Sequence, residues 1–319
     1  MFTPQQTALL FPGQGSQTVG MGRAFYDHPH TNPLFEKANE VLGYDLVDIM
    51  LNGPEEKLTL TENAQPAILL TSIVAWEYFK HKAELPVADI AAYAAGHSLG
   101  EYSALVAAGA LSFEDAIALV HTRGKAMQQA VPPGEGAMAA VLGLTFTDND
   151  SVARNTGCWI ANDNAEGQCV LSGSHQAVDE ASNMAVMQDA KKVMRLDVSA
   201  PFHCPMMEPA AKVMEDALKN IEIHEPAIPV VMNRTAQPVS KPDDIRTLLV
   251  EQITGMVRWR ESMQGLASIG VTTMFELGEG RVLSGLARRC AKSLKSTPLN
   301  SPLDIDNLLE ALKNNQEVA

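Results

Sequence analysis

Basic residues are scarce in this chain. Of its 319 residues, 24 are lysine or arginine and 38 are aspartate or glutamate, so the formal net charge is −14 at pH 7. A chain this acidic repels the phosphates of nucleic acids and anionic membrane surfaces, and we expect it to bind neither. An anionic partner would need a local basic patch.

Long uninterrupted apolar runs are also missing. The two most apolar stretches, residues 67–79 and 91–111, contain Glu77 and Glu101 respectively, and neither is expected to cross a membrane. Residues 1–17 lack a basic segment, and their apolar run is too short for a signal peptide. We therefore expect no membrane partner and no secretion.

Cysteine is rare and scattered. The four cysteines show no metal-ligand or redox spacing: Cys158, Cys169, Cys204 and Cys290. In a chain of this length, such cysteines are typical of free thiols in a reducing compartment. We expect a cytoplasmic protein without a cysteine-bound metal.

Apolar residues are plentiful, at 46% of the chain against 19% charged residues. This balance supports a large core, and a prior of about 150 residues per domain suggests two domains. Three apolar segments, each followed by a glycine-bearing turn and then helical periodicity, predict strands: 7–11 before 12–15, 90–95 before 96–100, and 272–277 before 278–280. The repetition predicts an α/β fold with a mostly parallel sheet, and glycine turns at the strand ends where active sites lie.

The middle of the chain has a different pattern. It predicts strands and helices in the order β-α-β-β-α-β: 136–144, 147–156 with Thr147 as cap, 158–161, 168–172 after the turn 162–167, 174–190 and 192–198. This is the ferredoxin-like order. We expect a small domain at residues 134–198, inserted into a large α/β domain at 1–133 and 199–319. The residues from Ser296 onward look peripheral.

Residues 96–100, Gly-His-Ser-Leu-Gly, match the pattern G-x-S-x-G. Glycines at both flanks permit a sharp strand-to-helix turn that exposes Ser98. The Leu99 N–H and the following helix N-terminus would then face the group that Ser98 attacks, as half of an oxyanion hole. An incidental serine in a glycine turn is the other interpretation, but the flanking strand and helix favour a nucleophile.

A serine nucleophile needs a base. Of the eight histidines, His203 lies in the proline-bracketed segment 199–205, and rigid loops between elements often hold catalytic groups. A packed loop histidine is the alternative. His97 is expected to point away from Ser98. No acid between Ser98 and His203 falls in a strand-end loop of the large domain, so the sequence offers no evident third carboxylate.

Arg123 is the next candidate. A helix is predicted over residues 113–130, with Ser112 as its cap and Asp115 three residues on. Arg123 borders the apolar face of this helix and should lie half inward. A solvated arginine is one interpretation; a guanidinium that grips a carboxylate through two hydrogen bonds is the other.

Six segments together resemble malonyl-CoA:acyl carrier protein transacylases, an acyltransferase family of fatty acid and polyketide synthesis. They are FPGQGSQ at 11–17, GHSLGEY at 96–102, RGKAMQ at 123–128, SAPFHCPMM at 199–207, VEQITGMVRW at 250–259 and FELGEGRVLSGL at 275–286. The similarity covers nearly the whole chain. It implies a large α/β-hydrolase-like domain with a mostly parallel sheet and an inserted ferredoxin-like small domain.

The resemblance implies roles for individual residues. Ser98 would be the acylated nucleophile and His203 its base. The backbone N–H groups of Gln14 and Leu99 would form the oxyanion hole.

Substrate selection follows from the same resemblance. Arg123 would bind the free carboxylate of the malonyl group, and the main-chain carbonyl of Gln252 would orient the base in place of a carboxylate. Asn162 resembles a position near the acyl site. Phe202 resembles the residue of malonyl-selective acyltransferases that blocks an α-methyl group. The chain departs from the family at Glu279, where a proline is usual.

The implied reaction is a ping-pong transfer of malonyl from malonyl-CoA, through a malonyl-serine, to the phosphopantetheine thiol of acyl carrier protein. It supplies fatty acid biosynthesis and uses no metal and no redox cofactor. One alternative is a serine esterase or thioesterase of the α/β-hydrolase type, which would need an acid and have no use for Arg123. An acyltransferase for another acyl-CoA is a second. A non-catalytic scaffold that binds carrier protein would be marked by loss of Ser98 or His203, and both are present.

Basic residues gather in two places that could meet an acidic carrier protein. The first group is predicted to lie on one helix after the third glycine turn: Arg288, Arg289, Lys292 and Lys295. The second is expected across the cleft, at the start of the small domain's last strand: Lys191, Lys192 and Arg195. A solvated basic face is the alternative. We expect a monomer.

Overall fold

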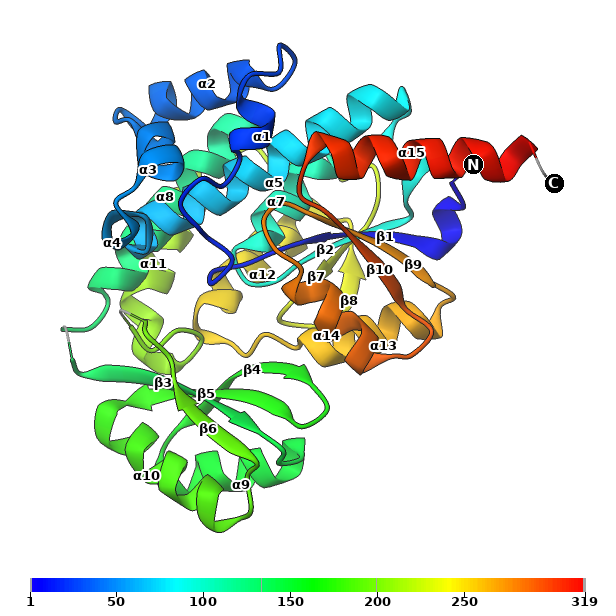
Figure 1. The fold of residues 1–319 in the computed structure, drawn as a ribbon. Coiled ribbons are helices and arrows are strands. Elements are labelled where there is room, and N and C mark those ends of the chain that lie inside the picture. Colours follow the sequence, from blue (N-terminus) through cyan, green and yellow to red (C-terminus); the bar gives the residue numbers. More distant parts are fainter. Residues whose placement is uncertain (1, 133, 199, 318–319) are drawn as a thin grey trace.

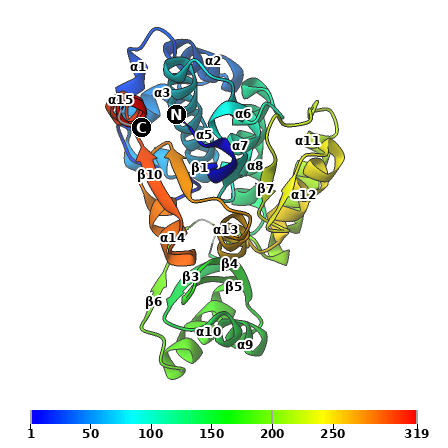
Figure 2. The ribbon, with the colours of Figure 1, turned by 90° about the vertical axis from the view of Figure 1, so that its right-hand side faces the viewer.

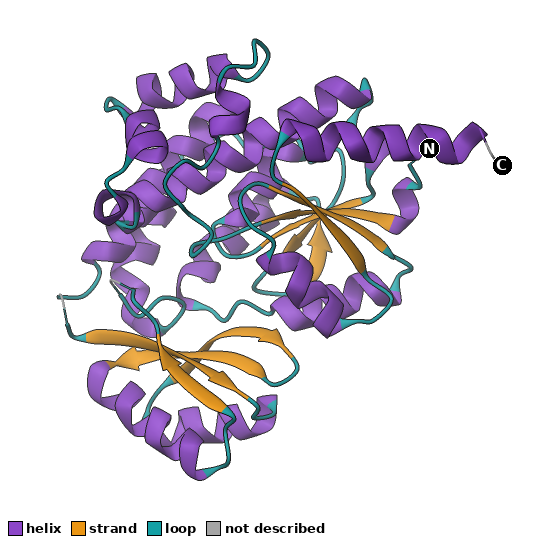
Figure 3. Ribbon diagram, viewed as in Figure 1, coloured by secondary structure: helices purple, strands orange, loops and turns teal. Residues whose placement is uncertain are grey.

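Two β-sheets organise the chain, one mostly parallel and one antiparallel (Figures 1 and 3). The computed structural model describes residues 2–132, 134–198 and 200–317. The strands are β1 Thr7–Phe11, β2 Tyr93–Gly96, β3 Gly136–Leu142, β4 Trp159–Ala165, β5 Gln168–Ser174, β6 Lys192–Arg195, β7 Val230–Met232, β8 Gln237–Val239, β9 Thr273–Leu277 and β10 Lys295–Leu299. The helices are α1 Arg23–Tyr26, α2 Asn32–Leu42, α3 Leu46–Asn52, α4 Glu55–Leu58, α5 Thr61–Ala83, α6 Val87–Ile90, α7 Gly100–Ala107, α8 Phe113–Gln129, α9 Phe146–Thr156, α10 His175–Met187, α11 Glu208–Leu218, α12 Pro242–Thr254, α13 Trp259–Ser268, α14 Val282–Cys290 and α15 Pro302–Glu317, with 3-10 turns at Pro4–Gln6 and Pro205–Met207.

The larger sheet has six strands in the order β10-β9-β1-β2-β7-β8. Every neighbouring pair is parallel except β7 and β8. The predicted α/β fold with a mostly parallel sheet is therefore confirmed at this level. Strand β1 has the bounds that the sequence predicts, and β9 begins one residue later than predicted.

Both faces of this sheet are covered, which is why β1 reads as a continuous apolar run. Leu9 and Phe11 face the core formed with helices including α5 and α8, whereas Ala8 and Leu10 face the residues of α13 and α14. Helix α5 is buried on all sides along most of its 23 residues, as expected for a helix without a polar face.

The smaller sheet has four antiparallel strands in the order β4-β5-β3-β6, and the chain enters its elements in the predicted order β3-α9-β4-β5-α10-β6. Along β3, Ala139 and Val141 face α9 and α10, and Met138 and Ala140 join the core of the larger part. The sheet thus lies between its own helices and the rest of the molecule (Figure 2). The expected domain boundaries adjoin residues 133 and 199, which lie outside the described residues.

Several local predictions are wrong at the ends of elements. Ile90 belongs to the short helix α6 after Pro86, not to β2. The cap of α9 is Thr145, because Thr145 and Asp148 form a reciprocal capping box that leaves Thr147 inside the helix. The helix predicted over residues 113–130, with Ser112 as its cap, is confirmed and ends one residue earlier, at Gln129.

Two further predictions fail because tertiary pairing overrides local composition. The polar segment 162–165, expected in a turn, continues β4, since Asp163 pairs with Arg260 and its N–H donates to the Val257 carbonyl at 3.0 Å. The residues from Ser296 onward are not peripheral: they form most of β10 of the large sheet and α15, whose Ile305 is buried.

The predicted helix face with Arg288, Lys292 and Lys295 is also wrong. Helix α14 ends at Cys290, and Lys295 opens β10 with its N–H bonded to the Thr272 carbonyl at 2.8 Å. Pairing with β9 therefore takes Lys295 out of helical spacing. No helix among the described residues is long and apolar enough to cross a membrane.

Candidate active site

Ser98 occupies a strained turn between β2 and α7. Its φ is +52°, in the left-handed region, and its N–H donates to Asn233 Oδ1 at 2.7 Å. A Cβ on Gly96 would lie 1.9 Å from the Gly100 carbonyl, and one on Gly100 would lie 2.2 Å from the Phe11 oxygen. Both glycines are thus required for the turn that presents Ser98 at the carboxyl end of the sheet.

His203 contacts Ser98, although the segment from β3 to β6 separates the two residues in the chain. Its Nε2 lies 2.7 Å from Ser98 Oγ, and its Nδ1 lies 2.9 Å from the main-chain oxygen of Gln252. Because a carbonyl only accepts, Nδ1 carries the proton and Nε2 is free to accept from the serine hydroxyl. Burial, then the charge of Arg123, lowers the pKa of His203 to about 3, so the ring is neutral.

Arg123 is more deeply placed than its sequence suggests. The expected half-inward position is wrong: the residue is 1% exposed. Its Nη2 donates to Ser98 Oγ at 3.0 Å and to Gln252 Oε1 at 2.8 Å, and its Nη1 donates to Gln65 Oε1 at 2.8 Å. Its Nε has no hydrogen-bond acceptor among the described residues. A buried guanidinium that contacts Ser98 through Nη2 and has an unpaired Nε suits an anionic ligand.

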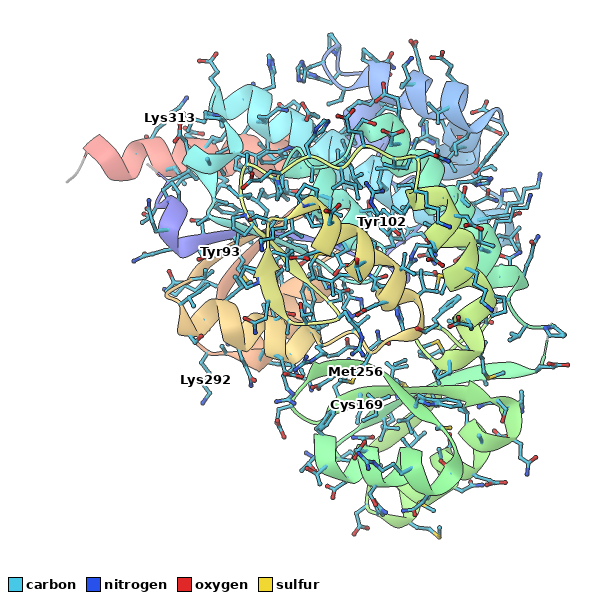
Figure 4. The ribbon with its side chains drawn as sticks, turned by 180° about the vertical axis from the view of Figure 1, so that it is seen from behind. Tyr93, Tyr102, Cys169, Met256, Lys292 and Lys313 are labelled. Carbon is cyan, nitrogen blue, oxygen red and sulfur yellow. The ribbon has the colours of Figure 1, made fainter. Side chains whose placement is uncertain are left out.

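A cavity of about 330 Å³ opens in front of Ser98. The expected site residues that line it are Gln14, Ser98, Arg123, Asn162, Phe202 and His203. Leu99 and Gln252 do not line it, but they adjoin residues that do. Among the described residues, neither the Gln14 N–H nor the Leu99 N–H donates a hydrogen bond, so both are available to an oxyanion. A second cavity of about 560 Å³ reaches His203 near Arg234 and Met256, and Met256 lies beside the smaller sheet in Figure 4.

His97 does not point away as expected, because it lines the same cavity as Ser98. Its Nε2 lies 2.8 Å from Asn164 Oδ1 and its ring lies 5.4 Å from that of Trp259. The contact with Asn164 of β4 ties the turn to the smaller sheet, and the contact with Trp259 ties it to α13. His203 is the histidine on the serine hydroxyl.

Glu101, Asn233 and Gln65 belong to the site and were missed from the sequence. Glu101 is completely buried, and burial raises its pKa to about 8. Its Oε2 accepts from Gln252 Nε2 at 2.5 Å and its Oε1 accepts from the N–H of Asn233. An acid inside the apolar run 91–111 was a signal for Glu101, whereas nothing local marks Asn233.

The basic groups proposed for docking lie at the surface. All four residues of the first group are exposed: Arg288, Arg289, Lys292 and Lys295. Lys292 projects outward in Figure 4. Arg289 is engaged with the turn between β4 and β5, through Gln168 and the Glu166 carbonyl, and Arg195 of the second group pairs with Asp179 at 3.3 Å. No cluster of metal-ligating side chains occurs in the described part of the chain.

Known proteins resemble this chain in sequence and in fold. Residues 8–300 match the family described as acyl transferase domain. The chain is 43% identical to a malonyl CoA-acyl carrier protein transacylase of Bacillus subtilis, over 98% of this chain and 99% of that protein. An acyl-carrier-protein-S-malonyltransferase from Bartonella henselae superposes with a TM-score of 0.93 at 42% identity, over 96% and 99% of the two chains. A chain in the structure of a type II PKS acyl-carrier protein in complex with its malonyl-transacylase matches with a TM-score of 0.92 at 38% identity, over 96% of this chain and 99% of that chain.

Proposed function

The chain belongs to the acyl transferase family, and from this membership we propose that it transfers malonyl from malonyl-CoA to the phosphopantetheine thiol of acyl carrier protein. The relatives named as malonyl transacylases and the carrier-protein complex of one similar structure support the donor and the acceptor. The supply of malonyl units to fatty acid biosynthesis fits this activity.

In this proposal Ser98 is the nucleophile and His203 the base. The observation that carries it is the 2.7 Å contact between Ser98 Oγ and His203 Nε2, with Nδ1 held by the Gln252 carbonyl. His203 takes the hydroxyl proton as Oγ attacks the thioester carbon, and the thiolate of CoA leaves with a proton from His203. A malonyl-serine ester remains. The carrier thiol then attacks this ester, with His203 as its base, and Ser98 is regenerated.

The proposed oxyanion hole consists of the backbone N–H groups of Gln14 and Leu99. Leu99 lies at the N-terminus of α7, where unpaired N–H groups and the helix dipole favour developing negative charge. Gln14 lines the cavity from the loop after β1, so the two groups approach from neighbouring strand ends.

Arg123 is proposed to hold the malonyl carboxylate. Its buried guanidinium lies on the serine oxygen, and its Nε is unpaired. An acyl group without a carboxylate would leave the buried Nε of Arg123 without an acceptor. Acetyl-CoA should therefore be a poor acyl donor. Phe202, in the same cavity, would limit substituents on the α-carbon, and Asn162 would lie beside the acyl group.

A serine esterase of the α/β-hydrolase type is the weaker proposal. Among the described residues, no Asp or Glu oxygen bonds to His203, whose Nδ1 is bonded to a main-chain carbonyl. A hydrolase would also have no use for a buried arginine on its nucleophile. Another acyl-CoA as donor fits the same machinery and is decided by the test below.

We further propose that residues 134–198 form a ferredoxin-like domain inserted into an α/β-hydrolase-like domain of residues 1–133 and 199–319. The strand order β4-β5-β3-β6 with two helices on one face supports the first description, and the turn at Ser98 supports the second. A monomer in a reducing, cytoplasmic setting remains our expectation, and the four unpaired cysteines fit such a setting.

The test is the intact mass of the protein after mixing with malonyl-CoA. We expect one malonyl adduct on Ser98 that disappears when holo acyl carrier protein is added. Ser98→Ala should form none, and His203→Ala should form it about 10²- to 10⁴-fold more slowly. Rapid loss of malonyl to water without carrier protein would favour the esterase, and an adduct in Ser98→Ala would refute the nucleophile.

A further inference from the structure

We propose that Glu101 is a positioning residue. Through hydrogen bonds with Gln252 and Asn233, it fixes the relative positions of Ser98, His203 and Arg123. Glu101 touches none of the reacting atoms. It accepts hydrogen bonds from two residues that between them contact all three members of the proposed site. This inference rests on the proposed function, and it adds a residue that the mechanism above does not use.

Gln252 is the first arm of this network. Its side-chain amide makes three hydrogen bonds. Nε2 donates to Glu101 Oε2 at 2.5 Å and to the Ser98 carbonyl at 2.9 Å, and Oε1 accepts from Arg123 at 2.8 Å. Its main-chain oxygen holds the His203 ring. Because the Arg123 guanidinium can only donate, Oε1 of Gln252 faces Arg123, and Nε2 is left to donate to Glu101.

Asn233 is the second arm. Its main-chain N–H donates to Glu101 Oε1, its Oδ1 accepts from the Ser98 N–H at 2.7 Å, and its Nδ2 donates to the Gly96 carbonyl at 2.7 Å. Asn233 follows β7 and thus joins the neighbouring strand to the turn before α7. Fixing its backbone at Glu101 fixes the side chain that supports the strained φ of Ser98.

The burial of this acid is unfavourable unless its oxygens are satisfied. Glu101 lies in the first turn of α7, a helix whose other buried members include Tyr102 and Leu105. Tyr102, labelled in Figure 4, has a buried hydroxyl without a hydrogen-bond partner among the described residues, whereas both oxygens of Glu101 are hydrogen-bonded. Burial outweighs the two donors and the charge of Arg123, so the pKa of Glu101 is raised to about 8, and both of its oxygens accept a hydrogen bond.

The substitution Glu101→Gln keeps the shape and changes the donors. One side-chain oxygen remains, so one of the two donors, Asn233 N–H or Gln252 Nε2, would meet an NH₂ group. If Gln252 turns its amide to relieve this clash, its NH₂ faces Arg123 and the Arg123 guanidinium loses an acceptor. The guanidinium and the serine should then shift relative to one another.

The test measures single-turnover acylation of Ser98 by malonyl-CoA and by acetyl-CoA. We expect Glu101→Gln to slow malonylation on the order of 10- to 100-fold, the scale for a site displaced by about 1 Å, and to lower the ratio of malonyl to acetyl adduct. Gln252→Ala, which keeps the main-chain carbonyl, should show the same change of ratio. In the double variant Glu101→Gln with Gln252→Ala, the fold losses in acylation rate should not multiply, because both substitutions disrupt the same hydrogen bond between Glu101 and Gln252.

The matched control is Glu276→Gln. Glu276 is also completely buried, and it accepts from the N–H groups of Leu283 and Ser284 at 2.9 and 2.7 Å, in α14. Its loss should lower the melting temperature and leave the acylation rate and the malonyl-to-acetyl ratio unchanged.

Three outcomes would overturn the proposal: an unchanged rate and ratio in folded Glu101→Gln, multiplicative losses in the double variant, or the same change of ratio in Glu276→Gln. If Glu101→Gln does not fold, Gln252→Ala decides alone, and an unchanged ratio there refutes the network. A wild-type protein that forms no malonyl adduct would instead refute the proposed function. The two failures are therefore distinguishable.

Discussion

Arg123 is buried and donates a hydrogen bond to Ser98 Oγ, so its substitution should change the acylation of the serine. We expect Arg123→Ala to reduce malonyl transfer severely, because the malonyl carboxylate loses its partner. Acetyl transfer should rise relative to malonyl transfer, because an acetyl group no longer leaves a buried guanidinium unpaired. Arg123→Lys should be nearly as damaging, since an ammonium cannot replace a planar fork that also serves Gln65 and Gln252. Acylation rates with the two CoA esters measure this, and an unchanged ratio in both variants would remove Arg123 from substrate selection.

The pH dependence of acylation follows from His203. Its pKa is lowered from 6.5 to about 3, first by burial and then by the charge of Arg123, so the ring stays neutral and able to accept a proton well below pH 6.5. The rate of Ser98 modification by a neutral serine reagent, phenylmethylsulfonyl fluoride, should therefore stay flat from pH 7.5 to 5.

Removing the neighbouring charge should shift this profile. In Arg123→Ala the pKa of His203 rises, and the rate should begin to fall at a higher pH than in the wild type. Circular dichroism at each pH controls for acid unfolding. A wild-type rate that falls with a midpoint near 6.5 would show that burial does not depress the pKa of this histidine.

At the scale of elements, the junction of β2 and α7 depends on close backbone approach. A Cβ on Gly100 would lie 2.2 Å from the Phe11 oxygen, and a backbone atom cannot move aside as a flexible side chain can. Gly100→Ala should therefore destabilise the protein by about 1–3 kcal/mol or more and impair acylation.

Gly285 offers a matched control for this prediction. It lies in α14, and a Cβ there meets nothing within 4 Å. Gly285→Ala should be neutral or stabilising by up to about 1 kcal/mol, because alanine is the better helix former. Thermal unfolding of both variants decides the point, and equal melting temperatures would contradict the steric account of the turn.

At the scale of the whole molecule, a net charge of −14 opposes an acidic carrier protein unless a local field attracts it. Arg288 and Lys292 are exposed around the end of α14, although they do not share the helix face that spacing predicted. If they dock the carrier, reversing both to glutamate should raise the KM for acyl carrier protein several-fold and leave acylation by malonyl-CoA unchanged. The effect should shrink as salt rises.

Lys82 and Lys313 supply the control for this prediction. They line a cavity beside Phe2 and Pro4, before β1, and Figure 4 shows Lys313 far from Lys292. Reversing both changes the net charge equally but should leave the KM for carrier protein nearly unchanged. An equal rise in both double variants would mean that total charge, not this patch, governs the encounter.

The sequence by itself determined the features that depend on neighbours in the chain. The strand–glycine–helix pattern around Ser98, the cap of α8 at Ser112 and the β-α-β-β-α-β order of the middle segment all follow from short-range periodicity and turn chemistry. The proline-bracketed segment 199–205 made His203 a candidate base. The resemblance in six segments assigned its role and added Gln252, whose position relative to Ser98 no periodicity can reveal.

Only the tertiary structure decided which groups meet across long separations. Glu101 and Gln252 lie 151 positions apart, and Ser98 and Asn233 lie 135 apart, yet each pair is hydrogen-bonded in the fold. Arg123 is fully buried instead of half inward, and α14 stops before Lys295, because α8 packs against α5 and because β10 pairs with β9. Such contacts depend on the packing of distant elements, which side-chain spacing along one helix or strand does not encode.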